Sequence, residues 1–105
     1  MFLPEHGFIV EKVGSVVPTK DGKHQYCDLI IRKPAPRNEF GEQTIADDVF
    51  QAKAWDKRIE LLNGLNKGDK VKIQLSITGK EQLDHDSSKI YYQMNLSVFK
   101  LEKLP

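Results

Sequence analysis

The stretch AKAWDKRIELLNGLNKGDKVKI, residues 52–73, decides the fold. It opens with the end of an alternating segment, whose last residue is Trp55, the only tryptophan in the chain. Asp56 is a favourable N-cap residue and Asn63-Gly64 is a helix stop, so the leucine-rich segment between them predicts a helix of about two turns. The Gly68-Asp69 turn then opens a second alternating segment. Because so short a helix is unstable alone, we expect its leucines to close one end of a sheet.

Alternation of apolar and polar residues predicts five strands around this helix. They are expected at residues 7–19, 26–33, 45–55, 70–78 and 90–104. Gly14 interrupts the first strand and predicts a bulge, and Asp21-Gly22 predicts the turn of a hairpin between the first two strands. The segment 34–43, which holds two prolines and Phe40, is expected to be an exposed loop, and 79–89 is expected to be a hairpin tip.

The third predicted strand has two different faces. Its alternation places Ala52 and Ala54 on one face, and Lys53 and Trp55 on the other. Three strands, a helix and two strands form the element order of the OB-fold, an all-β five-stranded Greek-key barrel whose ligands bind across the second and third strands. An SH3-like barrel lacks a capping helix in this place. We therefore expect residues 1–105 to form one OB-fold domain.

Composition narrows the class of protein further. The chain has 105 residues and a net charge of +1, so overall basicity does not indicate a nucleic-acid binder, and any such function must depend on where the charges lie. The single cysteine, Cys27, excludes an internal disulfide and is expected to be buried. The sequence contains no signal-peptide pattern and no apolar run of membrane-spanning length. We expect a soluble cytoplasmic protein that does not bind membranes.

From Gly41 to Ile77 the sequence resembles the bacterial and phage single-stranded DNA-binding proteins. In that family a third strand ends in an aromatic residue and is followed by a helix, a KG turn and a VxI strand; here these are VFQAKAWDKRIELLNGL, NKGD and VKIQLSI. The resemblance implies that Trp55 stacks on bases, with Lys53 on the same face. The sequence ends in KLEKLP, without the acidic tail of the general replication proteins. This favours a phage, mobile-element, accessory or primosomal-like member.

Single-strand binding needs aromatic platforms for bases and cations for phosphates. The candidate residues are Trp55, Lys53, Phe40, Arg37, Arg32, Lys33, Tyr26, Lys57, Lys72 and Lys80. Alternation alone leaves Trp55 equally open to packing against the helix, and Tyr26 equally open to a place in the core. Tyr91 and Phe99, on the last strand, are expected to be structural or to lie at a subunit interface.

The histidines His6, His24 and His85 are scattered without metal-ligand spacing, and no phosphate-binding glycine motif is present. We therefore expect neither an enzyme nor a cofactor or metal. The leading hypothesis is sequence-independent binding of single-stranded DNA in replication, recombination or repair, with RNA left open as a ligand. We expect a homodimer or homotetramer that meets replication or recombination proteins. The alternative is a protein-interaction or assembly module, primosomal-like, without strong nucleic-acid binding.

Overall fold

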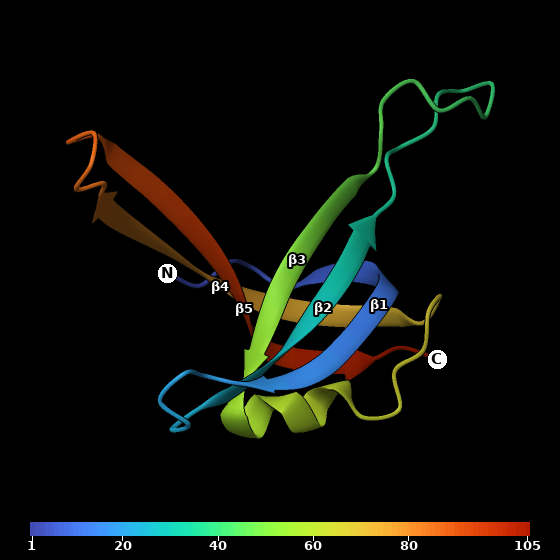
Figure 1. Cartoon of the computed structure of the whole chain (residues 1–105). Coiled ribbons are helices and arrows are strands. Elements are labelled where there is room, and N and C mark those ends of the chain that lie inside the picture. The colour runs from blue at the N-terminus through green and yellow to red at the C-terminus, as the bar shows by residue number, and fades with distance from the viewer.

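The computed structural model describes the whole chain from Met1 to Pro105 and contains five strands and one short helix. The elements are β1 (His6–Pro18), β2 (Gln25–Lys33), β3 (Asp48–Trp55), η1 (Asp56–Leu62), β4 (Lys70–Leu83) and β5 (Ile90–Lys103). The strands form a closed barrel in the order β1-β2-β3-β5-β4, as Figure 1 shows. The predicted OB-fold is confirmed. No helical segment has the length and hydrophobicity needed to cross a bilayer.

Strand β1 bends so that it can pair with two neighbours. Its first residues, from His6 to Ile9, pair with β4, and the part from Ile9 to Pro18 pairs with β2. The register with β2 shifts around Gly14, where an added Cβ atom would lie 3.3 Å from the carbonyl oxygen of Asp28. The bulge predicted at Gly14 is therefore confirmed, and glycine allows the two backbones to approach closely there.

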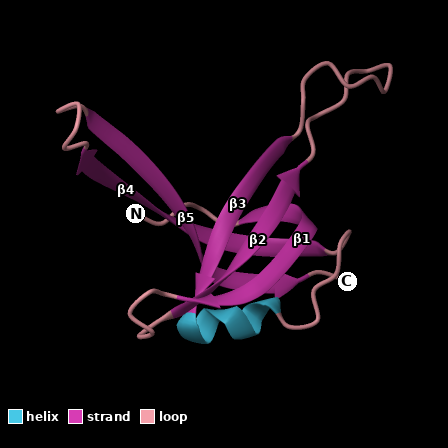
Figure 2. Ribbon diagram, in the orientation of Figure 1, coloured by secondary structure: helices cyan, strands magenta, loops and turns pink.

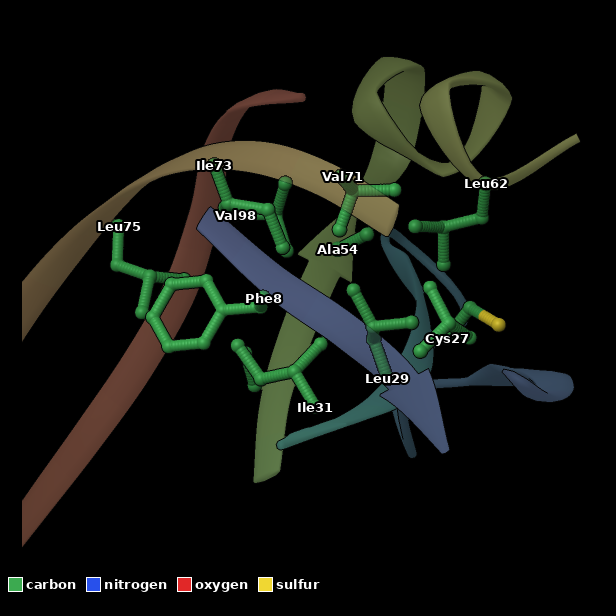
Figure 3. Close-up of a cluster of buried hydrophobic side chains, with 12 residues drawn as sticks. Phe8, Cys27, Leu29, Ile31, Ala54, Leu62, Val71, Ile73, Leu75 and Val98 are labelled. Atoms are coloured by element: carbon green, nitrogen blue, oxygen red, sulfur yellow. The ribbon is translucent and has the colours of Figure 1, made fainter. Parts of the chain in front are cut away.

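The barrel interior is filled by alternate residues of all five strands and by one leucine of the helix (Figure 3). Ala52 and Ala54 of β3 are fully buried, while Lys53 and Trp55 between and after them are only partly buried. The face assignment predicted for β3 is thus confirmed. Cys27 is also buried, as expected, and burial raises the pKa of its thiol.

The helix η1 covers one end of the barrel, as Figure 2 shows. Leu62 is buried in the core, and Ile59, Leu61 and Leu65 pack against it, so the predicted plug is confirmed. The helix is of the 3-10 type. Side chains three residues apart are eclipsed in a 3-10 helix, so Ile59 and Leu62 point to the same side.

The predicted role of Asp56 as an N-cap is wrong. The N-cap position is Trp55, and no side chain caps the helix. Asp56 instead has a φ of 51° in the left-handed region, and its carboxylate turns toward the loop before β2. There it accepts hydrogen bonds from the backbone amide of Gln25 at 3.0 Å and from the ring of His24 at 2.9 Å. The carboxylate therefore stabilises the β3–η1 junction from outside the helix.

Two predicted boundaries are also wrong. Strand β3 begins at Asp48, three residues later than Ile45. Strand β4 continues to Leu83, so that Gly79–Leu83 pairs with Ile90–Met94 and the hairpin tip is shorter than predicted. We call this part of the hairpin, residues 79–94, the arm; it projects beyond the barrel in Figure 1. Residues 79–82, GKEQ, are polar enough to suggest a loop, and they are exposed because the barrel does not cover them.

The core makes a direct prediction about stability. Ile73 is fully buried, so Ile73→Ala should lower the free energy of unfolding by about 2–5 kcal/mol through lost burial and a cavity. Ile90, in the arm, is 50 % exposed, and Ile90→Ala should change it by only about 0.5 kcal/mol. Urea unfolding of both variants measures the difference; equal losses would contradict this assignment of the core.

Candidate nucleic-acid interface

The outward face of β2 and β3 is built from four cross-strand pairs. Because side chains alternate along a strand, every second residue of each strand lies on this face, opposite the buried residues. The pairs are Tyr26 with Trp55, Asp28 with Lys53, Ile30 with Gln51, and Arg32 with Val49. We call these eight residues the β2–β3 face. It runs from an aromatic pair beside the helix to a cation beside the long loop that joins the two strands.

The aromatic pair lies at the end of β3 that adjoins the helix. The ring centroids of Tyr26 and Trp55 are 5.2 Å apart and their planes are inclined by 49°. Both residues are partly exposed, and neither belongs to the barrel core. Of the two alternatives left open for Tyr26, a core position is excluded. The two rings form a partly open aromatic surface of the kind on which bases stack.

Lys53 lies beside these rings. Its Nζ atom is 4.3 Å from the centroid of Tyr26 and 5.9 Å from that of Trp55, which are cation–π distances. Lys53 belongs to no ion pair. The face therefore combines an aromatic surface with a cation that forms no ion pair.

Arg32, at the other end of the face, is already held by two carboxylates. Its Nε donates to Glu11 at 2.6 Å and its Nη1 donates to Asp47 at 3.2 Å. The same carboxylate of Asp47 accepts the backbone amide of Ala35 at 2.8 Å, which ties both ends of the loop between β2 and β3 together. The hydrogen bond from Arg32 lowers the pKa of Glu11, and the two carboxylates raise the pKa of Arg32. Glu11 and Asp47 therefore already neutralise the charge of Arg32 in the protein without DNA.

The remaining predicted residues lie away from this face. Two lie in the loop between β2 and β3: Phe40 is 77 % exposed, and Arg37 donates to the carbonyl oxygen of Gly41. Lys33 follows Arg32 but donates to the carbonyl oxygen of Gly7, 2.9 Å away. Of the predicted residues, the β2–β3 face therefore contains Trp55, Tyr26, Lys53 and Arg32. It does not contain Phe40, Arg37 or Lys33.

Three predicted lysines also lie outside the β2–β3 face. Lys57 is exposed at the start of η1, Lys80 is exposed on the arm, and Lys72 on β4 pairs with Glu5 at 3.2 Å. Phe99 contacts Phe2, at 4.6 Å between ring centroids, and its ring lies 4.8 Å from the Arg58 guanidinium carbon. This packing supports the structural alternative for Phe99.

Sequence reasoning missed Asp28 and Ile30 on this face. The signal was available, because the parity that places Cys27 and Leu29 inward places their neighbours outward. Asp28 places a carboxylate between the Tyr26–Trp55 pair and Arg32. A negative charge was not expected on a surface that binds phosphates. The chain holds no group of three or more His, Cys, Asp or Glu side chains suited to a metal ion.

Comparison with solved structures identifies proteins of similar fold. A deletion mutant of the single-stranded DNA-binding protein from Thermus aquaticus aligns with a TM-score of 0.62 and 16 % identity over 99 % of this chain and 51 % of that one. The Plasmodium falciparum single-stranded DNA-binding protein in complex with single-stranded DNA aligns with a TM-score of 0.63 and 16 % identity, over 99 % and 94 %. This chain thus spans about half of the Thermus protein. No family model and no curated protein matches the sequence.

The Arg32 cluster predicts a loss of stability in acid. Hydrogen bonds from Ala35 and then from Arg32 hold the pKa of Asp47 below its ordinary value of 3.8. The unfolded chain therefore binds this proton more readily than the folded one. The stabilisation is complete above pH 3.8 and is lost as the pH falls below that value toward the lowered pKa.

Asp47→Asn should accordingly lower the Tm at pH 7. The difference in Tm between this variant and the parent protein, called the gap below, should narrow below about pH 4. Thermal unfolding followed by circular dichroism across pH 2–7 measures this gap. Asp86→Asn, at the hairpin tip, is the matched control, because the Asp86 side chain makes no hydrogen bond or ion pair. A gap that is constant with pH would show that Asp47 acts through packing alone.

Proposed function

We propose that this protein binds single-stranded DNA without strong sequence preference, across the β2–β3 face, in replication, recombination or repair in the cytoplasm. The observation that carries the proposal is the Tyr26–Trp55 pair with Lys53 beside it. This pair lies on the surface where OB-folds bind oligonucleotides. The fold shared with two single-stranded DNA-binding proteins supports it.

Stacking explains why such a site would accept any sequence. Every base has a π-face, and stacking on an aromatic side chain contributes about 1–3 kcal/mol per base. Lys53 would contact a phosphate next to the stacked base. Because Arg32 is already paired with Glu11 and Asp47, the face offers few free cations, and we expect a moderate dependence on salt. A net charge of +1 is compatible with this, since the cation that matters is local.

We also propose that the protein acts as a homodimer or homotetramer. One face holds a single aromatic pair, so one barrel offers a short binding site. Exposed apolar residues favour association: Leu83, Ile90, Tyr92 and Met94 of the arm are each at least half exposed.

A fluorescence titration tests the binding proposal. Trp55 is the only tryptophan, so its emission reports on this face alone. Adding oligo-dT should quench the emission, and the quenching should weaken as salt rises. The same titration with oligo-rU compares DNA with RNA. Absence of quenching and of a mobility shift at low salt would overturn the proposal and favour the protein-interaction module.

Removing the tryptophan should weaken binding by the stacking energy of about one base. We expect Trp55→Ala to raise the Kd for labelled oligo-dT about 5- to 150-fold, as measured by fluorescence anisotropy. Tyr91→Ala is the matched control, because Tyr91 is an aromatic residue of the arm that is 51 % exposed. If both variants lose affinity equally, the binding surface is not confined to the β2–β3 face.

Lys53 should contribute one phosphate contact. For single strands each contact changes the slope of log K against log salt by about 0.7. Lys53→Gln should therefore make the slope shallower, by at most this amount. Lys100→Gln is the control, since Lys100 also lies near an aromatic ring, 5.6 Å from the Phe99 centroid, but on β5. Equal slopes for Lys53→Gln and the parent protein would remove Lys53 from the site.

A further inference from the structure

Asp28 is only partly buried, but it carries the one shielded side-chain nitrogen or oxygen atom without a hydrogen-bond partner. Its Oδ1 atom is shielded from solvent and has no hydrogen bond. The β1 bulge lies close to this residue, since a Cβ atom added at Gly14 would be only 3.5 Å from that of Asp28. An unpartnered buried oxygen is unfavourable for the folded state, so its presence in the middle of a binding face needs a reason.

The natural partner for this carboxylate lies directly across the sheet. Asp28 is paired in register with Lys53, and cross-strand neighbours have Cβ atoms about 4.5–5.5 Å apart, well within the reach of a lysine. Yet the two form no ion pair; the ammonium lies over the Tyr26 ring. Lys53 thus has two partners on one face, an aromatic ring that it occupies and a carboxylate that it leaves free.

Stacking of a base on Tyr26 would change which group Lys53 contacts. A base that stacks on Tyr26 needs the ring surface over which the Lys53 ammonium lies at 4.3 Å, so the ammonium must move. Two anions can then receive it: the carboxylate of Asp28 or a phosphate of the bound strand. We infer that Asp28 is a positioning residue that takes up Lys53 when a base displaces it from Tyr26, and so competes with the DNA phosphate for this cation.

The inference rests on the proposed function and explains the empty carboxylate. When a base binds, the face would gain stacking energy, and Asp28 would gain Lys53 as an ion-pair partner. The contact between Lys53 and the DNA phosphate would be weaker as a result. Binding would then depend more on bases than on salt, and the strand would dissociate more readily than from a face without Asp28.

The test is a double-mutant cycle on labelled oligo-dT, measured by anisotropy between 20 and 300 mM salt. Asp28→Asn removes the competing charge at nearly constant shape. It should raise affinity about two- to fivefold at low salt and make the salt slope steeper, because Lys53 then contacts phosphate fully. This increase and the decrease caused by Lys53→Gln should together come to about 0.7, the contribution of one phosphate contact. In the Lys53→Gln background the same change should leave the slope unaltered. Glu102→Gln on β5 is the control for net charge.

The outcomes separate this inference from the proposed function. If the parent protein does not bind oligo-dT, the proposed function fails and the inference fails with it. If the parent binds and Asp28→Asn leaves affinity and slope unchanged, only the inference is overturned. It is also overturned if Asp28→Asn steepens the slope equally with and without Lys53, or no more than Glu102→Gln does, because the carboxylate then acts as a general charge. Thermal unfolding of each variant confirms that the fold is retained.

Discussion

The closed barrel depends on the pairing of β3 with β5, which is limited to a single pair of residues. The two strands meet in parallel through one register pair, Lys53 with Ser97, and this contact closes the barrel. Beyond it the strands diverge, β3 toward the long loop and β5 into the arm, as Figure 1 shows. Closure at this point fixes the direction of the outward side chains of β3. The backbone of Lys53 pairs with Ser97 to close the barrel, and the side chain of the same residue lies beside the rings of Tyr26 and Trp55.

The sequence predicted those features that repeat along a strand. Alternation around Ala52 and Ala54 identified the inward face of β3, and the leucine spacing after Trp55 identified the plug, because burial imposes both patterns. Features that depend on contacts between distant segments were not predictable in this way. The Asp56 carboxylate was assigned to its own helix, whereas the structure directs it to Gln25, which only the approach of the β1–β2 hairpin makes available.

The candidate site shows the same division. Alternation placed Lys53 and Trp55 outward together, and that part of the site could be derived from local sequence. The pairing of Trp55 with Tyr26, and of Lys53 with Asp28, follows from the register of β2 with β3, which a single sequence does not specify. Arg32 was expected to be a free cation; its capture by Glu11 and Asp47 requires β1 and the end of the long loop to come together.

The arm has a consequence for solubility. A two-stranded hairpin has two unpaired backbone edges, and exposed edges are templates for uncontrolled strand addition between molecules. Charged side chains at an edge oppose such addition, and the outer part of β4 carries Lys80 and Glu81. The polar residues 79–82, which made the outer part of β4 resemble a loop, therefore have a protective value. They allow a long hairpin to extend into solvent while its backbone edges are discouraged from aggregating.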